Sequence, residues 1–533
     1  MAKKRATDFD VRAAMRDPGF TPRAGDAGAL LDALAEAGDD ARLAEQALLR
    51  LGAAAVGPAS ARAQAESAAH RAAALRLLGR LAAEVQNPAA PAALLAGLGD
   101  GDERVRRAAA SALGRARPEG AAEALAAALG RETGASARRA LVEALGKVGG
   151  EAAIAALGGE EAAGAERERG RAKLMATRSL ARETPSVIVA DRTPEAPIRA
   201  ALRCRAGLET ILLKELPAAF GGRIERDALG GLRIEGTLRE APIALFQART
   251  FLSLGFPLEA VRAGEDPTEA VVAALTSPEA RGILRRFTEG PLRFRLSFRG
   301  GGKRRAAVWR VAAEVAARAP ELLNDPTESP WEAQVFEAPG LVRVELVPAI
   351  VDPRFTYRTG DVPAASHPTI AAALARAGGV RPDDVVWDPF VGSGTELCER
   401  ALAGPYRRLV GSDVDPRALD VARKNLEAAG VRDAALIAGD ATSLRPPGPP
   451  PTLVISNPPL GRRVHRGAGL GGLLERFVEN AAGLLVKGGR LVWISPFPQR
   501  TRDAAAARGL RLAEAHEVDM GGFAAEMQVL VKR

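Results

Sequence analysis

The stretch VVWDPFVGSGTELCERAL, residues 385–402, places the strictest limit on how this chain can fold. An apolar run ends at Asp388, a glycine turn follows at Gly392 and Gly394, and a helical pattern begins near Thr395. This order lets a ligand approach backbone N–H groups closely. A dinucleotide-binding fingerprint would need a small residue at Leu397, and a P-loop would need Gly-Lys-Ser or Gly-Lys-Thr. The stretch therefore predicts an α/β domain whose ligand is not held mainly through phosphate.

Polar residues also follow the next predicted strands. The strand RRLVGSD ends at Asp413, 21 residues after Gly392, where a carboxylate can accept both hydrogen bonds of a ribose diol. Asp440 and Ala441 follow the strand AALIAG, and Asn457 follows PTLVIS. In an open α/β sheet, ligands bind at the carboxyl ends of the strands. We therefore expect these residues to share one crevice.

Four motifs in this order resemble those of class I S-adenosylmethionine-dependent methyltransferases that methylate amines. They are DPFVGSGT (388–395), GSDVDP (411–416), GDAT (439–442) and NPPL (457–460). The resemblance implies S-adenosylmethionine as the cofactor. The residues that it implies for cofactor binding are Asp388, Phe390, Gly392, Gly394, Thr395, Asp413, Asp440, Ala441 and Asn457.

The NPPL corner is the catalytic motif that the resemblance implies, with Asn457, Pro458, Pro459 and Leu460 as its residues. In such a corner, the Asn side-chain oxygen and the carbonyl of the next proline accept the two N–H bonds of a planar exocyclic amine. Proline fixes φ, so these acceptors are held rigidly where positive charge develops. Leu460 departs from the family, which usually has Tyr or Phe there. Leucine lacks aromatic stacking, which contributes about 1–3 kcal/mol per base.

A basic strand lies upstream of this domain. Alternation in LRFRLSFR predicts an apolar face and a cationic face with Arg293, Arg295 and Arg299, and Lys303, Arg304 and Arg305 follow. Charge alone does not separate an RNA-binding face from a solvated one. Residues 203–216 and 357–379 resemble segments of THUMP-domain RNA guanine-N2 methyltransferases, and 292–316 with 340–349 resemble THUMP itself more weakly. This resemblance implies that the strand contacts structured RNA.

The first 160 residues repeat a helical phrase that ends in Leu-Gly, at Gly52, Gly79, Gly114 and Gly146. The spacings of 27, 35 and 32 residues suit stacked helical pairs, and the pattern resembles HEAT repeats. Each glycine suits a helix C-cap, and Asp102 suits an N-cap, with Arg106 and Arg107 on the exposed side. An Ala-rich helical bundle without a regular superhelix is the alternative.

Composition limits the remaining possibilities. Lys and Arg outnumber Asp and Glu by 74 to 65, which favours a polyanionic partner. Cys204 and Cys398 have no CxxC spacing, so neither a disulfide framework nor a metal site is expected. Cys398 suits a core position, and His367 and His465 suit structural or RNA-facing roles. No apolar run is long enough for a membrane span, so we expect a cytoplasmic protein.

The expected multidomain architecture has four parts. HEAT-like helical repeats occupy 22–160, a linker 161–197, a ferredoxin-like plus THUMP-like α+β region 198–350, and a Rossmann-like methyltransferase domain 351–533. The expected function is methylation of an exocyclic amine in structured RNA, with guanine N2 in rRNA or tRNA as the target. A protein partner on the HEAT-like region is also expected. The alternatives are methylation of adenine N6 or a protein glutamine, or a HEAT scaffold whose methyltransferase fold is inactive.

Overall fold

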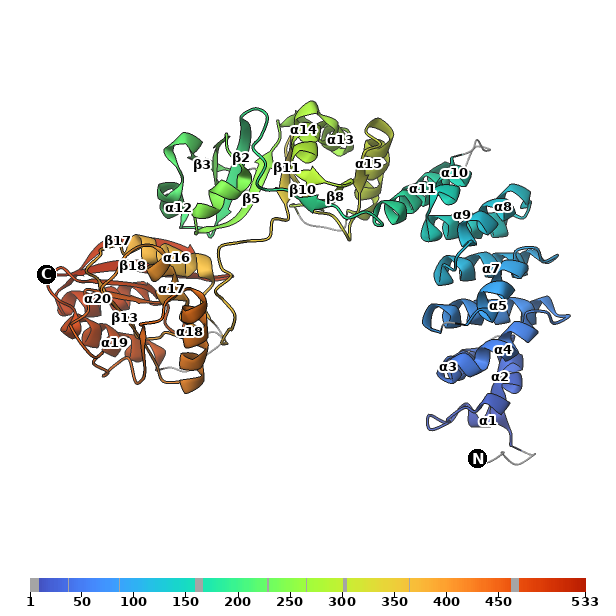
Figure 1. The fold of residues 1–533 in the computed structure, drawn as a ribbon, viewed down its shortest axis with the longest axis horizontal. Coiled ribbons are helices and arrows are strands. Elements are labelled where there is room, and N and C mark those ends of the chain that lie inside the picture. Colours follow the sequence, from blue (N-terminus) through green and yellow to red (C-terminus); the bar gives the residue numbers. More distant parts are fainter. Residues whose placement is uncertain are drawn as a thin grey trace. The chain divides into compact units, whose positions relative to one another are not determined.

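The computed structural model describes residues 9–36, 38–85, 87–158, 166–227, 230–264, 266–300, 304–363, 365–461 and 469–533 (Figure 1). The chain forms two compact units. The first comprises Met1–Ser186, Gly290–Phe294 and Arg304–Ser329, and the second comprises Val187–Glu289, Arg295–Lys303 and Pro330–Arg533. Lys303 and His465 lie outside the described residues.

The first unit begins with a helical solenoid. Its helices are α1 (Val11–Ala14), α2 (Ala27–Leu34), α3 (Asp39–Leu51), α4 (Ala53–Arg62), α5 (Ala68–Glu84), α6 (Ala89–Gly97), α7 (Glu103–Ala116), α8 (Ala121–Arg131), α9 (Ala135–Val148), α10 (Glu151–Leu157) and α11 (Glu166–Ala181), after the 3-10 turn η1 (Ala24–Asp26) at the start of α2. Helices α5, α7, α9 and α11 form a row in which each contacts the next. The core is built almost wholly from Ala, Leu and Val.

The repeated glycines have two different roles. Gly52 caps the C-terminus of α3 with φ of 55°, as expected. The C-cap expectation is wrong for Gly79, Gly114 and Gly146, which lie inside α5, α7 and α9. A Cβ on Gly79 would lie 2.5 Å from the Cβ of Ala112, and Gly114 and Gly146 meet the next helix at a comparable distance. The Leu-Gly phrase therefore repeats because it lets neighbouring helices approach closely.

Other local expectations for the solenoid are tested by its hydrogen bonds. The Asp102 side chain accepts from Arg104 N at 2.7 Å, which confirms it as the N-cap of α7. Arg107 is exposed, as expected. Arg106 is not, because its guanidinium donates two bonds of 2.8 Å to the buried carboxylate of Glu132.

The end of the solenoid packs on a helix from much later in the chain. Helix α11 lies within the stretch expected as a linker and contacts both α9 and α15 (Arg305–Arg318), as Figure 1 shows. Arg178 of α11 stacks over the Trp309 ring at 4.8 Å and donates to Asn324 Oδ1 at 2.8 Å. Arg182 pairs with the buried Asp325 at 2.5 Å. These contacts fix the solenoid to α15 within one compact unit.

The second unit starts with an antiparallel α+β region. Its strands are β1 (Val187–Ile188), β2 (Ile198–Cys204), β3 (Arg223–Arg226), β4 (Leu232–Leu238), β5 (Phe251–Pro257), β6 (Val261–Arg262), β7 (Thr288–Glu289), β8 (Leu292–Phe298), β10 (Trp331–Ala338) and β11 (Leu341–Pro348). Its helices are α12 (Glu209–Glu215), α13 (Thr268–Thr276) and α14 (Pro278–Arg286), with 3-10 turns η2 (Ala218–Phe220) and η3 (Pro242–Gln247).

The main sheet of this region runs in the order β3-β4-β2-β5-β11-β10-β8, with β6 beside β11. The first residues of β8 belong to the first unit, where Leu292 pairs in parallel with Leu322 of β9 (Leu322–Asn324). Strand β2 leads into α12, as the sequence predicts.

The α+β region is anchored to the C-terminal domain within the second unit. Arg249 donates two bonds to the buried carboxylate of Glu399, at 2.6 and 2.9 Å, and a third to the Arg354 carbonyl at 2.6 Å. Tyr357 donates to the same carboxylate at 2.6 Å. Leu208 and Ile211 join the core of the C-terminal domain.

The C-terminal domain is a doubly wound α/β sheet. Its strands are β12 (Val385–Asp388), β13 (Arg408–Asp413), β14 (Ala435–Ala438), β15 (Leu453–Ser456), β16 (Arg490–Ser495), β17 (Leu510–Asp519) and β18 (Ala524–Lys532), and its helices are α16 (Pro368–Ala377), α17 (Thr395–Leu402), α18 (Pro416–Ala428), α19 (Leu470–Leu484) and α20 (Pro498–Ala507). The strand order is β14-β13-β12-β15-β16-β18-β17, and β18 is antiparallel to both neighbours. The predicted strands ending at Asp388, Asp413 and Ser456 are confirmed.

Within the described parts of the chain, no helix is long and apolar enough to cross a membrane.

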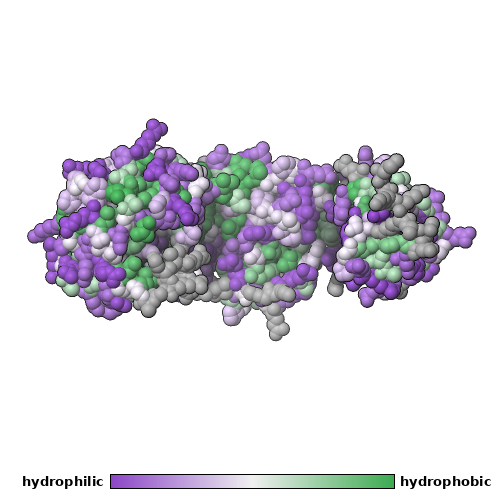
Figure 2. Space-filling view, turned by 90° about the horizontal axis from the view of Figure 1, so that it is seen from below, coloured by the Kyte–Doolittle hydropathy of each residue, from purple (hydrophilic) through white to green (hydrophobic). Residues whose placement is uncertain are grey.

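On the face shown in Figure 2, hydrophobic residues form separate patches among hydrophilic ones.

Candidate active site

The candidate site lies where the strand order of the sheet reverses. β12 pairs in parallel with β13 on one side and with β15 on the other. This arrangement opens a crevice at the carboxyl ends of β12 and β15, the usual ligand position in an open α/β sheet. Asp388 ends β12, and Asn457 follows β15. Ser456 joins them, because its hydroxyl donates to Asp388 Oδ1 at 2.7 Å.

The glycine loop packs tightly over the sheet. Gly392 and Gly394 have φ of 50° and 79°, a conformation that favours glycine. A Cβ on Gly394 would lie 3.1 Å from the Cβ of Ala422 in α18. Gly392 N donates to Asp413 Oδ2 at 3.0 Å, so the loop is bonded to the end of β13. Thr395 is buried at the start of α17.

Asn425 of α18, which sequence reasoning missed, holds this loop in place. Its side chain donates to the Ser393 and Gly360 carbonyls, both at 2.9 Å, and accepts from Thr359 N and Gly360 N. The residue is fully buried. An Asn on the apolar side of a predicted helix was the available signal, because a buried amide needs polar partners.

Two buried carboxyls lie beneath the loop without a bonded cation. Burial, and then the charge of Glu396, raise the pKa of Asp388 well above its usual range. Burial also raises the pKa of Glu396 to about 7, with a further contribution from Glu399. Asp388 Oδ2 and Glu396 Oε1 have no hydrogen-bond partner among the described residues. A cationic group in the crevice would therefore meet two carboxyl oxygens that are not bonded to any described residue.

The amide of Asn457 is oriented by a hydroxyl. Asn457 Nδ2 donates to Ser366 Oγ at 2.8 Å, and the Ser366 hydroxyl lies near enough to the Glu396 carboxyl to lower its pKa. Because the NH2 end is engaged by Ser366, the amide is fixed with Oδ1 on its other side. Asn457 Oδ1 is buried and has no partner within the described chain. A buried acceptor left free at the end of a strand can receive a ligand N–H.

The rest of the corner is apolar. Pro458 is buried, and Pro459 and Leu460 are partly buried. Leu460 packs against the core cluster of this domain.

The other predicted cofactor residues lie along the same edge of the sheet. Phe390 packs edge-on against Phe477 at 5.2 Å. The Asp440 carboxylate accepts from the backbone and hydroxyl of Thr442, both at 2.8 Å, and these bonds lower its pKa. Ala441 is buried.

Comparison with known proteins decides what kind of site this is. The RMKL-like methyltransferase domain family matches residues 356–526, and HEAT repeats match 57–146 and 91–177. The tRNA (guanine(6)-N2)-methyltransferase of Thermus thermophilus is 31% identical over 350 residues, which cover 61% of this chain and 97% of that protein. The chain belongs to the guanine-N2 methyltransferase family.

Further relatives agree with this assignment. The crystal structure of TrmN from Thermus thermophilus matches with a TM-score of 0.53 and 26% identity, over 63% of this chain and all of that one. A tRNA (guanine(10)-N2)-dimethyltransferase of Methanothermobacter thermautotrophicus is 32% identical over 135 residues, 25% of this chain and 39% of that protein. The methyltransferase fold and the HEAT repeats predicted from the sequence are confirmed, and S-adenosylmethionine is the cofactor of this methyltransferase.

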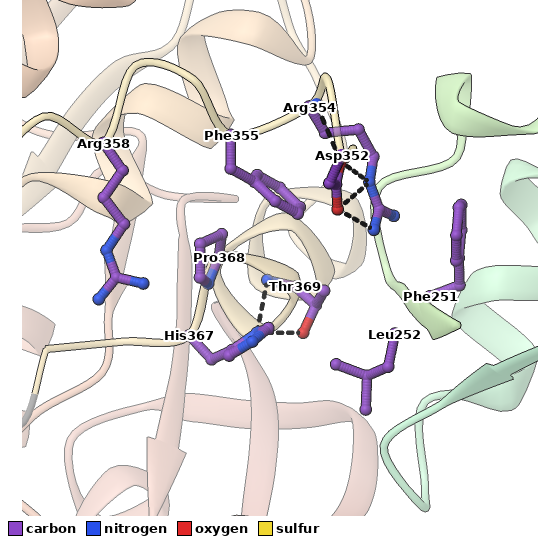
Figure 3. A pocket seen from close by; sticks show the side chains of 9 residues that line it. All are labelled: Phe251, Leu252, Asp352, Arg354, Phe355, Arg358, His367, Pro368 and Thr369. Atoms are coloured by element: carbon purple, nitrogen blue, oxygen red, sulfur yellow. Dashed lines mark hydrogen bonds and ion pairs between the residues drawn. The ribbon is translucent and has the colours of Figure 1, made fainter. Parts of the chain in front are cut away.

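A cavity of about 380 Å³ lies between strand β5 and the first turn of α16 (Figure 3). Its lining residues are Phe251, Leu252, Asp352, Arg354, Phe355, Arg358, His367, Pro368 and Thr369. His367 caps α16, since its Nδ1 accepts from Thr369 N. Burial and then the charges of nearby arginines lower its pKa. The sequence predicts a structural or RNA-facing role for His367, and its capping bond is a structural role; Cys398 is a buried core residue as expected.

The basic strand differs from its prediction at one position. The expectation that Arg293 lies on an exposed cationic face is wrong, because it is buried and donates to the Thr184 carbonyl. Arg295 is exposed but pairs with Glu332 at 2.7 Å. Arg299 and Arg305 are exposed, Arg304 is partly buried, and Lys303 lies outside the described residues. Arg293 and the adjacent Phe294 are both buried, so the two residues do not alternate between a buried and an exposed face.

Proposed function

We propose that this protein methylates the exocyclic N2 of a guanine in tRNA. The observation that carries the proposal is the buried Oδ1 of Asn457, which has no partner among the described residues and belongs to an amide held by Ser366 at the switch point of a methyltransferase sheet. Relatives named as tRNA guanine-N2 methyltransferases support guanine as the target, and the relative of Thermus thermophilus makes position 6 the first to test.

The chain's own groups would position the reacting amine. Asn457 Oδ1 and the Pro458 carbonyl would accept its two N–H bonds, so the nitrogen lone pair faces the methyl donor. S-adenosylmethionine supplies an electrophilic methyl group on a sulfonium. As the nitrogen bonds to the methyl carbon, the bond from that carbon to sulfur would break and the nitrogen would become positive until it loses a proton. The two fixed acceptors would stabilise this charge without reorganising. Pro458 and Pro459 keep the backbone of the corner rigid.

The crevice residues fit the charges of this cofactor. Asp413 would accept from the ribose hydroxyls, and the carboxyls of Asp388 and Glu396, each with one oxygen unbonded among the described residues, would face the ammonium of its methionine part. The exposed Arg299 and Arg305 would contact the RNA backbone, and we place the protein in the cytoplasm, where tRNA is found.

Purified protein, tRNA and labelled cofactor, followed by nucleoside mass spectrometry, would test the reaction. We expect N2-methylguanosine. N6-methyladenosine or methylated protein would favour the alternative substrates. Leu460, which lacks an aromatic ring, is the observation that keeps an inactive scaffold as the second candidate, and a chain that transfers no methyl group would support it.

Asp413→Ala is expected to weaken cofactor binding by about 1.5 kcal/mol or more, since hydrogen bonds to a charged group contribute on this scale. Calorimetry would measure the cofactor affinity of both chains. Asp415→Ala is the matched control, because Asp415 caps α18 two residues away, where its side chain accepts from Arg417 N. Equal affinity of the Asp413 variant and the parent would refute the ribose assignment.

Cofactor affinity should also depend on pH. The raised pKa of Glu396, about 7, means that its carboxyl is protonated below that pH and ionised above it. An ammonium group binds the ionised form better, so affinity should fall as pH drops, by up to about tenfold between pH 7.5 and about pH 6. Calorimetry of Glu396→Gln shows the share that comes from Asp388 and from the cofactor's own amine. A parent that follows the same pH curve as this variant would contradict the role of Glu396.

A further inference from the structure

The solenoid carries a groove of about 610 Å³ where α3, α5 and α7 meet. Polar residues on its lining are Glu45 of α3, Arg76, Arg80 and Glu84 of α5, and Ser111 and Arg115 of α7. The relative from Thermus thermophilus is matched almost completely by 61% of this chain, so about two fifths of the chain have no counterpart in it. The function of the relatives therefore gives no role to this groove.

The groove holds more positive than negative charge. Arg80 is neutralised by Glu45 at 2.7 Å. Arg76 and Arg115 form no ion pair within the described residues. Burial lowers the pKa of Arg76, and the charge of nearby Arg107 lowers it further. Glu45 and Glu84 are the carboxylates on the described lining, and the charge of Glu45 offsets part of the effect of Arg107 on Arg76. Like charges held close together repel, and an anion between them would remove that cost.

We propose that this groove binds the phosphate backbone of the RNA substrate. The inference rests on the proposed function, which supplies a polyanion. Guanidinium groups bind phosphate through two parallel hydrogen bonds and do not require a particular base. The solenoid and α15, whose first residue is the exposed Arg305, belong to one compact unit joined by α11. RNA held at the groove and RNA held at α15 would therefore be bound by the same compact unit.

The test replaces Arg76, Arg107 and Arg115 together with Gln and measures tRNA binding by the full chain over a range of salt concentrations. Each phosphate contact contributes about 0.7–0.9 to the slope of log affinity against log salt. We expect binding to weaken at least about tenfold at low salt and the slope to fall by about two to three. Ser111→Glu, which adds an anion to the groove, should weaken binding in the same direction.

The control makes the same change to Gln at Arg62, Arg117 and Arg131, which lie on the same solenoid but do not line the groove. Unchanged tRNA affinity in the groove variant, or an equal loss in the control, would overturn the proposal. So would a groove that binds an acidic peptide but not tRNA. Cofactor binding and the rate at saturating tRNA should be unaltered in the groove variant. A failure of the groove proposal can therefore be told apart from a failure of the proposed methylation.

Discussion

Asn457→Ala is expected to lower the single-turnover rate of methyl transfer by roughly a hundred- to a thousandfold. Removing one preorganised polar contact from a developing charge typically costs about 2.7–4 kcal/mol. Cofactor and tRNA affinity should change little, because the interaction strengthens mainly in the transition state. A single-turnover assay with labelled cofactor measures the rate directly.

Ser366→Ala is the matched variant for this experiment. It removes the bond that orients the amide but leaves Asn457 Oδ1 in place. The loss should therefore be smaller than for Asn457→Ala, and Ser366→Thr should recover part of it because it restores a hydroxyl. Normal turnover by Asn457→Ala would show that the corner does not bind the reacting amine.

Asp384→Ala is expected to cause the largest loss of stability. Asp384 lies just before β12, at the end of the sheet opposite the crevice, and is fully buried. It accepts from Arg400 at 2.9 Å and from Arg490 at 2.8 Å, and both guanidinium groups are buried. Removing one partner of a buried ion pair leaves uncompensated charge and costs about 3–5 kcal/mol.

Chemical denaturation, followed by tryptophan fluorescence of the C-terminal domain, would measure this loss. The control is Glu475→Ala, which removes the partner of Arg500 on the surface and should leave the free energy of unfolding nearly unchanged. A similar small change for Asp384→Ala would mean that the two arginines find other partners or water.

The strand ends of the catalytic domain were predictable because each apolar strand ends in a polar residue at a fixed place in the βαβ pattern. Asp388, Asp413 and Asn457 could be placed in one crevice for that reason. Ser366 and Asn425 could not, since each reaches the site from 91 and 32 residues away along the chain, to Asn457 and Ser393 respectively. Such contacts depend on tertiary packing. Ser366 left no local pattern, and the position of Asn425 on the apolar side of a helix indicated only that its amide needs polar partners.

Local patterns also misled at two points. The glycines of the solenoid look like C-caps in a sequence, yet Gly79 is selected by its distance to Ala112 in another helix. Arg293 fits a cationic face by alternation, yet the chain covers it with the segment at Thr184. In both cases, a residue from elsewhere in the chain determines the surroundings of the side chain or glycine. The periodicity of the local sequence cannot predict such a contact.

The most direct test of the central claim is nucleoside mass spectrometry of tRNA from cells that lack this protein, complemented with the parent chain or with Asn457→Ala. The parent should restore N2-methylguanosine at one tRNA position, and Asn457→Ala should not. Restoration by both chains, or no change in any modified guanosine on loss of the protein, would contradict the assignment of guanine N2 methylation to this site.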